Sequence, residues 1–147
     1  MYSARRPVIL SGGGVIASRA TDGLRQLAEF LGAPVVTTMM GKGSFPEDHP
    51  LYGWHAGSKG TTCGNKLTST ADIILAIGCR FADETCSSYR PDVSFSIPPT
   101  KLIHIDVDPN EIGKNYPVEV GIISDARSAL NSIISALKEL GPAKEYM

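Results

Sequence analysis

The chain has 147 residues, of which 42% are hydrophobic and 20% charged, and its formal net charge is −1. This length and composition predict a single domain over residues 1–147, with a frayed tail at 142–147. The low net charge argues against a nucleic-acid partner, and the lack of a long apolar run argues against a membrane span. The three cysteines include no C-x-x-C pair, so a reducing, cytoplasmic setting is favoured over a zinc site or disulfide bonds.

The first clear pattern in the chain is an apolar run that ends in three glycines. Residues 7–11 are expected to form a buried strand, and Gly12, Gly13 and Gly14 follow it, with Ala17 completing a G-x-G-x-x-A pattern. Such a strand-to-helix turn lets the backbone approach a pyrophosphate closely, and the N-terminus of the next helix favours negative charge. The turn therefore predicts a nucleotide-type site, with a plain turn as the alternative reading.

Helix and strand signals alternate after this turn. Leucines at helical spacing predict a helix with Ser18 as its N-cap and Gly32 as its stop. Residues 34–38 are expected to form a short strand, and residues 39–60, rich in Gly and Pro, a long functional loop. The second strand ends in threonines where an NAD-binding unit would carry an acid, which argues against an ordinary NAD dehydrogenase.

The second half of the chain continues the alternation. We expect a short helix at 61–69, apolar strands at 73–77, 102–107 and 118–123, and an irregular segment at 84–100. The last helix shows a clear apolar stripe, with Ser124 or Asp125 as its cap and Gly141 as its stop. Strands that are almost uniformly apolar predict a parallel sheet covered on both faces, which is an α/β fold.

Polar and glycine residues follow several of the predicted strands. Ligands bind beyond the carboxyl ends of the strands in an open parallel sheet, so we expect these residues to converge on one edge. The segments concerned are 12–14, 37–40, 78–83 and 106–108. His55 in the glycine-rich loop is expected to contact a ligand, whereas His104 within a strand is expected to lie in the core, and Cys63 and Cys79 to pack.

Three of the candidate residues have a structural alternative. Asp106 can accept hydrogen bonds from a ribose or cap the turn that follows it. Arg80 can pair with a phosphate or form a salt bridge with Asp83 or Glu84. Asp125, judged alone, is a helix cap.

Taken together, five segments resemble one family in order and spacing. They are PVILSGGG at 7–14, PVVTTMMGKG at 34–43, HPLYGWH at 49–55, ADIILAIGCRF at 71–81 and HIDVDPNEIGK at 104–114. The series resembles the central domain of thiamine-diphosphate-dependent enzymes, and the acetolactate synthase catalytic subunit in particular, over about residues 6–140. The resemblance implies a Rossmann-like three-layer sandwich of the DHS-like NAD/FAD-binding type, with a mostly parallel sheet of about six strands. In acetolactate synthases this domain lies between two thiamine-binding domains and holds an FAD that takes no net redox part.

The resemblance also assigns residues to the parts of the cofactor. Gly12, Gly13 and Gly14 would face the ribityl and phosphate region, and Thr38, Met39 and Met40 would line the flavin side. Gly53 and His55 match a segment that contacts FAD, and Arg80 matches an arginine at the phosphates. The adenosine end would be met by Asp106, Val107, Asp125 and Ala126. Some relatives bind ADP in place of FAD, and others bind nothing.

The chain departs from this family's pattern in ways that leave the substrate open. Residues 78–84 read GCRFADE where the family usually has a second arginine at the last position, so Glu84 reverses a charge at the active-site entrance. Trp54 replaces a methionine, and Ala56 replaces a glycine. A related carboligase, a sulfoacetaldehyde acetyltransferase and a cyclic-diketone hydrolase are the alternatives to an acetolactate synthase.

The catalytic parts of the family have no counterpart in this sequence. Neither the Gly-Asp-Gly motif that holds Mg²⁺ and diphosphate nor the cofactor-activating glutamate can be placed, so we assign no catalytic and no metal residue. We expect a domain fragment or a stand-alone descendant, inactive alone, whose apolar surface favours self-association. The rival hypotheses are a ligand-free scaffold and a small nucleotide-binding regulator. An NAD-linked lysine deacylase is disfavoured, because this sequence lacks the Gly-Ala-Gly start and the zinc-binding cysteines of such enzymes.

Overall fold

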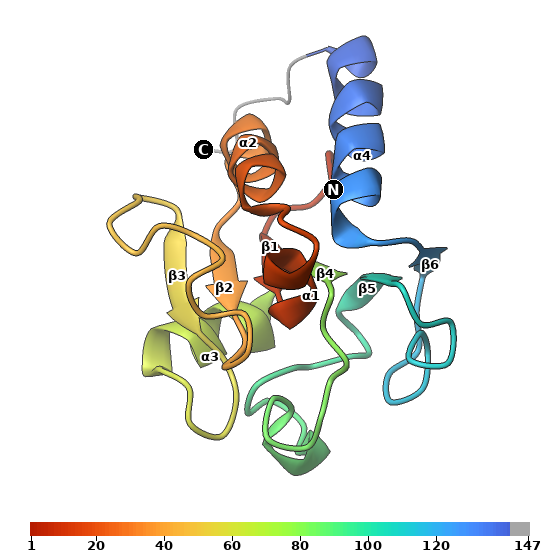
Figure 1. Ribbon diagram of the computed structural model, residues 1–147. Helices are drawn as coiled ribbons and strands as arrows, with labels where there is room; N and C mark the ends of the chain where they lie inside the picture. Colours follow the sequence, from red (N-terminus) through yellow and green to blue (C-terminus); the bar gives the residue numbers. More distant parts are fainter. Residues whose placement is uncertain (142–147) are drawn as a thin grey trace.

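The computed structural model describes residues 1–141, so the predicted frayed tail at 142–147 lies outside the described residues. The described residues form six strands and four α-helices. Strands and helices largely alternate along the chain (Figure 1). The strands are β1 (Pro7–Ser11), β2 (Val35–Thr37), β3 (Tyr52–His55), β4 (Ile73–Ile77), β5 (Lys101–Asp106) and β6 (Val120–Ile123). The helices are α1 (Gly13–Ala17), α2 (Thr21–Leu31), α3 (Thr62–Thr70) and α4 (Ala126–Leu140), with a 3-10 turn η1 (Ser87–Tyr89).

The six strands form one parallel sheet in the order β3-β2-β1-β4-β5-β6. Ile9 of β1 pairs with Val35 on one side and with Leu75 on the other, so β1 lies inside the sheet. From β1 the chain first builds one side of the sheet and then returns to build the other from β4. The carboxyl ends of β1 and β4 therefore form a switch point, where open parallel sheets bind ligands.

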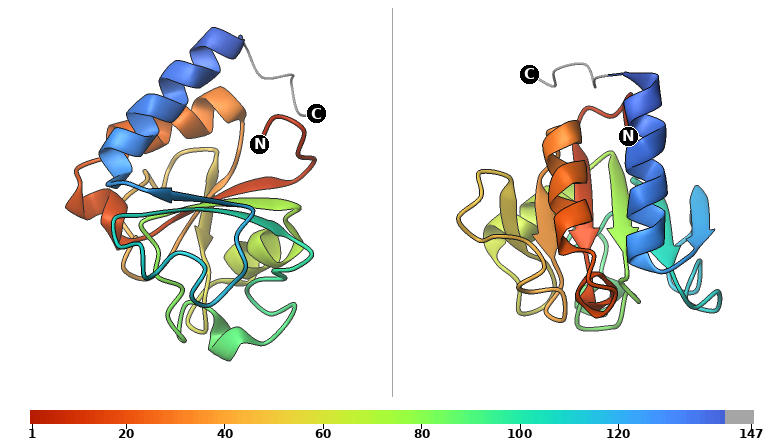
Figure 2. Two further views of the ribbon diagram at one scale, coloured as in Figure 1. Left: turned by 90° about the vertical axis from the view of Figure 1, so that its right-hand side faces the viewer. Right: turned by 45° about the horizontal axis from the view of Figure 1, so that its top comes forward.

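Helices cover both faces of the sheet, which gives the three-layer α/β architecture expected from the sequence (Figure 2). Helices α2 and α4 pack side by side on one face, over a core that includes Ile9, Leu75 and Ile105. On the other face, α3 and the segment before β5 cover a second core that includes Leu10, Ile74 and Leu102. Successive side chains of each strand point to opposite layers, which explains why the inner strands are largely apolar on both faces.

Strand β3 corrects the prediction that residues 39–60 form one loop. Its burial alternates weakly, Gly53 interrupts it, and it pairs only with β2 at the edge of the sheet. An edge strand of four residues with one buried position lacks the apolar run by which the inner strands were identified. The other strands and α3 lie within two residues of the expected bounds.

The first helix also differs from the prediction, because Ser18 does not begin it. The chain becomes helical at Gly13, directly after β1, and Ser18 is the C-cap of α1. The Ser18 hydroxyl donates a hydrogen bond backward to the Gly14 carbonyl at 2.8 Å, and Arg19 then adopts a left-handed φ of 53° that separates α1 from α2. Gly32, by contrast, ends α2 with a φ of 61°, as predicted.

Candidate functional site

Two adjoining cavities open at the carboxyl edge of the sheet. The first, which we call the glycine cavity, has a volume of about 600 Å³, and its lining includes Gly13, Gly14, Thr38, Gly78, Asp106, Val107, Asp125 and Ala126. The second, which we call the loop cavity, has a volume of about 700 Å³, and its lining includes Met39, His55, Lys59, Glu84, Tyr89, Glu111 and Asn115. Both volumes fall in the range of small-molecule sites. Met40, Arg80, Ala82 and Thr85 line both cavities, which makes them two halves of one cleft.

The convergence predicted from the strand ends is confirmed. Residues that follow β1, β2, β4 and β5 all line the glycine cavity, although they lie up to ninety-odd positions apart in the chain. Arg80 and Asp106 are therefore on the same side of the sheet as the triple-glycine turn.

The glycines of this turn serve first to bring two backbones together. A Cβ on Gly14 would lie 2.7 Å from the Cα of Gly78, and a Cβ on Gly12 would overlap the Gly78 carbonyl. A Cβ on Gly13 would lie 3.2 Å from the Cβ of Met40. Gly13 and Gly14 line the glycine cavity, whereas Gly12 lies behind it and allows the turn to pack against the end of β4.

Arg80 is held at the junction of the two cavities. The ion-pair alternative for this residue is wrong, because Glu84 pairs with Lys59 at 3.8 Å and no acidic side chain among residues 1–141 forms a salt bridge with Arg80. Lys114 is likewise paired with Glu111, at 3.8 Å. Arg80 thus presents a guanidinium with no carboxylate partner in the described chain to the space that both cavities share.

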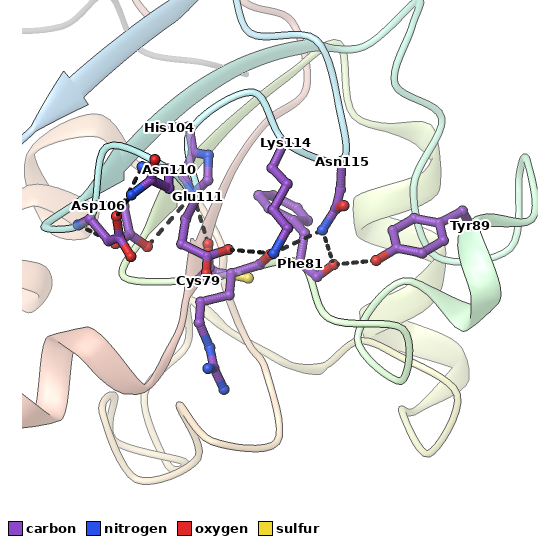
Figure 3. Close-up of polar contacts among 11 residues, drawn as sticks. Cys79, Phe81, Tyr89, His104, Asp106, Asn110, Glu111, Lys114 and Asn115 are labelled. Atoms are coloured by element: carbon purple, nitrogen blue, oxygen red, sulfur yellow. Dashed lines mark hydrogen bonds and ion pairs between the residues drawn. The ribbon is translucent and has the colours of Figure 1, made fainter.

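Asp106 performs the capping role that the sequence offered as an alternative. Its Oδ1 atom accepts a hydrogen bond from the Asp108 amide at 2.9 Å (Figure 3). Its Oδ2 atom lies 4.0 Å from Nε2 of His104, and the residue also lines the glycine cavity. Capping the turn and facing the cavity are therefore compatible roles for one carboxylate.

His104 is a satisfied core histidine, as predicted. Its ring is 1% exposed, and its Nε2 atom lies 2.7 Å from the Cys79 carbonyl oxygen. Burial lowers the pKa of His104 below its ordinary value of 6.5, although the hydrogen bond to Cys79 and the carboxylate of Asp106 oppose this effect. Burial therefore favours the neutral ring, which links β5 to the residues that follow β4.

His55 lines the loop cavity, as the sequence predicted for a ligand contact. Its Nδ1 atom is buried and has no hydrogen-bond partner among the described residues. An unpaired buried polar atom is costly unless something satisfies it, so this nitrogen is suited to a hydrogen bond with a ligand.

Gly53 lies in neither cavity. A Cβ there would meet Leu67 of α3 at 2.7 Å and Val36 of β2 at 3.0 Å, so this glycine allows α3 to pack on the sheet. Because Gly53 lines neither cavity, its position does not support the predicted contact with FAD.

The remaining predicted residues lie at the cavity rims. Met39, Met40 and Val107 expose 53%, 74% and 70% of their surface, so apolar side chains form part of the rim. Asp125 caps α4 by accepting a hydrogen bond from the Ser128 amide at 3.0 Å, and this bond lowers the pKa of its carboxyl group. Ala126, beside it, is buried.

Comparison with known proteins agrees with this arrangement. Residues 1–133 match the family described as "Thiamine pyrophosphate enzyme, central domain". The chain belongs to this family. It is 48% identical over 134 residues to a probable acetolactate synthase large subunit of Methanocaldococcus jannaschii, covering 91% of this chain and 22% of that protein. It is 43% identical over 135 residues to the acetolactate synthase large subunit of Corynebacterium glutamicum, covering 92% of this chain and 21% of that one.

A mycobacterial relative gives the same result. Identity to an acetolactate synthase large subunit of Mycobacterium tuberculosis is 40% over 136 residues, or 92% of this chain and 21% of the relative. The chain thus spans about a fifth of the length of the curated relatives it matches. It is a central domain of the kind found in acetolactate-synthase-like thiamine pyrophosphate enzymes.

Several cavity residues of this central domain escaped the sequence analysis. Lys59, Thr85, Tyr89, Glu111 and Asn115 lie on three loops, at 56–61, 82–90 and 108–119. No periodic pattern marks these loops, and only the fold brings them to the same edge. The signals in the sequence are coarse. Lys59 lies in the predicted functional loop at 39–60 and Glu111 in the motif at 104–114, but neither pattern singles out the residue. Thr85 and Tyr89 lie in the segment at 84–100, which shows no helix or strand pattern.

The cysteines of this central domain correct one prediction. Cys79 and Cys86 are buried, and burial raises the pKa of each thiol to about 12, but Cys63 is exposed on α3 and does not pack in the core. Across residues 1–141 no group of three or more His, Cys, Asp or Glu side chains is arranged to hold a metal ion. None of the helices in that range is long and apolar enough to cross a membrane.

Proposed function

We propose that this central domain binds FAD or an adenine nucleotide such as ADP in the cleft formed by the glycine and loop cavities. The observation that carries the proposal is the position of Arg80, which lines both cavities and has no salt-bridge partner among residues 1–141. A planar guanidinium forms paired hydrogen bonds with phosphate oxygens, and such bonds are stronger than neutral ones.

Other residues of the cleft fit the remaining parts of such a ligand. Asp106 offers a carboxylate to ribose hydroxyls in the glycine cavity, next to the α4 N-terminus at Asp125 and Ala126. Met40 at the junction and Met39 in the loop cavity suit an apolar ring, and the unpaired Nδ1 atom of His55 suits a polar ring substituent. We therefore assign the adenosine end to the glycine cavity and the flavin end to the loop cavity.

We further propose that the domain belongs to a larger acetolactate-synthase-like enzyme that condenses two 2-oxoacids with loss of CO₂. Thiamine diphosphate, held with Mg²⁺, supplies the carbanion chemistry in such an enzyme. The residues of this chain do not fit that cofactor, since no Gly-Asp-Gly motif occurs in the sequence. Two thiamine-binding domains elsewhere in the parent would hold it, and this domain would brace them.

Exposed apolar residues in the cleft and on strand β3 support the bracing role. Met39 and Met40 line the loop cavity, Trp54 lies on β3, and each exposes more than half of its surface. Apolar side chains that stay exposed beside a binding cleft are typical of surfaces that another domain covers.

Titration of the purified chain with FAD and with ADP, followed by calorimetry and thermal unfolding, tests the nucleotide proposal. At a ligand concentration of 100 times Kd, unfolding should cost about 2.7 kcal/mol more than without ligand. Arg80→Ala should weaken ADP binding about tenfold or more, because it removes charge-assisted hydrogen bonds. Arg5→Ala is the matched control, since Arg5 lies outside both cavities. Absence of any shift with either ligand at millimolar concentration would instead favour a ligand-free scaffold.

A further inference from the structure

The backbone around Arg80 is held in an unusual conformation. Phe81 follows Arg80 directly, has a left-handed φ of 54°, and is only 2% exposed. A bulky residue rarely adopts this conformation, and such outliers persist only where the surrounding structure holds them. Because Phe81 turns inward, its neighbours Arg80 and Ala82 both face the cleft.

The ring of Phe81 is fixed by aromatic packing. It makes edge-on contacts with Phe95, His104 and Tyr116, at centroid distances of 5.4, 5.2 and 5.3 Å. These rings come from the segment before β5, from β5 itself and from the loop that follows β5. This packing anchors the side chain but leaves the orientation of the peptide group after Phe81 to other contacts.

Two polar side chains hold that peptide group. The Phe81 carbonyl oxygen accepts one hydrogen bond from the Tyr89 hydroxyl at 2.9 Å and another from Asn115 Nδ2, also at 2.9 Å. Asn115 Nδ2 also lies 3.4 Å from the Arg80 carbonyl oxygen. Figure 3 shows Tyr89 and Asn115 reaching the Phe81 carbonyl from two different loops.

The loop that carries Tyr89 is itself strained. Ser87, Ser88 and Tyr89 have φ values of 50°, 54° and 59°, three consecutive left-handed residues that are not glycine. Hydrogen bonds hold this turn, including one of 2.6 Å between the hydroxyl oxygens of Ser87 and Ser94. This turn places the Tyr89 hydroxyl within hydrogen-bond distance of the Phe81 carbonyl oxygen.

We propose that Tyr89 and Asn115 are positioning residues that set the Arg80 guanidinium for a phosphate-bearing ligand by clamping the Phe81 carbonyl. The inference rests on the proposed function for its ligand, but the clamp itself can be tested without one. The proposal predicts that the clamp raises the affinity for nucleotides but not for nucleosides, because only the phosphates would contact Arg80. Both clamp residues line the loop cavity, yet neither need touch the ligand to have this effect.

The first test compares ADP with adenosine by calorimetry on the purified chain. Asn115→Ala and Tyr89→Phe should each weaken ADP binding about three- to tenfold, the effect of losing one hydrogen bond, and leave adenosine binding unchanged. Asn131→Ala on the exposed face of α4 and Tyr52→Phe in β3 are matched controls that should change neither affinity. Equal losses for ADP and adenosine would show a merely structural role and overturn the proposal.

A double-mutant cycle identifies Arg80 as the group that the clamp acts through. In an Arg80→Ala background, Asn115→Ala should cause no further loss of ADP affinity. If Asn115→Ala weakens ADP binding by the same factor with and without Arg80, the proposal is overturned, because the clamp would then act on a group other than Arg80.

A second measurement needs no ligand. Trypsin cleaves after arginine, and the clamp should protect the Arg80–Phe81 bond in the folded protein. Cleavage at this bond, followed by mass spectrometry, should accelerate at least threefold in Asn115→Ala relative to the other tryptic sites and to Asn131→Ala. An unchanged rate would overturn the clamp. If neither ADP nor FAD binds the wild-type chain, the proposed function fails, while accelerated cleavage would still establish that the clamp holds Arg80.

Discussion

Gly14 and Gly78 lie backbone against backbone at the switch point of the sheet. A Cβ on Gly14 would lie 2.7 Å from the Cα of Gly78, and a Cβ on Gly78 would lie 2.6 Å from the Cα of Gly14. The first residues of α1 can therefore rest directly on the end of β4. This contact determines where the floor of the glycine cavity lies.

Substitution of either glycine should destabilise the domain. Gly78→Ala combines overpacking with the strain of its φ of 61°, and we expect a loss of about 3 kcal/mol or more in the free energy of unfolding. Gly32→Ala is the matched control, because Gly32 has the same φ and nothing within 4 Å of the added Cβ, so it should lose only about 1 kcal/mol. Urea denaturation measures the free energy of unfolding of both variants. Equal losses would show that the close contact between Gly78 and Gly14 does not affect stability.

Burial of His104 should make stability depend on pH. Its pKa is lowered by burial in the folded protein, so the unfolded chain binds a proton that the folded chain does not. The stability that it contributes is therefore complete above the unfolded value of about 6.5 and declines as the pH falls below it. Urea midpoints measured from pH 7.5 to 5 should show this decline, and His104→Gln should flatten it.

The control for this titration is Asn131→Ala on the exposed face of α4, which removes no titratable group and should leave the pH profile as in the wild type. NMR provides a second measurement, since the ring signals of His104 should titrate below the ordinary histidine value of 6.5. A His104 ring that titrates at or above 6.5 would contradict the burial argument.

The three cysteines should differ sharply in reactivity. Cys63 is exposed, whereas Cys79 and Cys86 are buried and have pKa values raised to about 12, which leaves almost no thiolate near pH 8. A disulfide reagent should therefore modify one thiol rapidly in the native protein and all three in denaturant. Cys63→Ser should abolish the rapid phase; a second rapid thiol in the native wild type would show that a buried cysteine becomes accessible.

The isolated chain should not catalyse the reaction proposed for its parent. Incubation with pyruvate, thiamine diphosphate and Mg²⁺ should yield no acetolactate above the level without protein, because the sequence contains no Gly-Asp-Gly motif to hold the Mg²⁺ and diphosphate. Colorimetric detection of acetoin after acidification measures the product. Turnover above background would refute the assignment of the catalytic centre to other domains.

The sequence by itself determined the fold class and the edge of the sheet at which the cleft lies. Apolar runs of five or six residues identified the inner strands β1, β4 and β5, because strands covered on both faces are largely apolar. Glycines and polar residues directly after these runs identified the cleft, because parallel strands all end at the same edge. Strand β3 has no such run, because Gly53 interrupts it and its other residues are aromatic or histidine, so the sequence did not predict it.

Only the tertiary structure decided the roles of individual residues at that edge. Whether Glu84 pairs with Arg80 could not be read from the sequence, because its partner in the structure is Lys59 from another loop. Gly53, placed at the cofactor by motif, makes room for Leu67 instead. Tyr89 and Asn115 carry no sequence signal, because loops without periodicity acquire their neighbours only when distant strands bring them together.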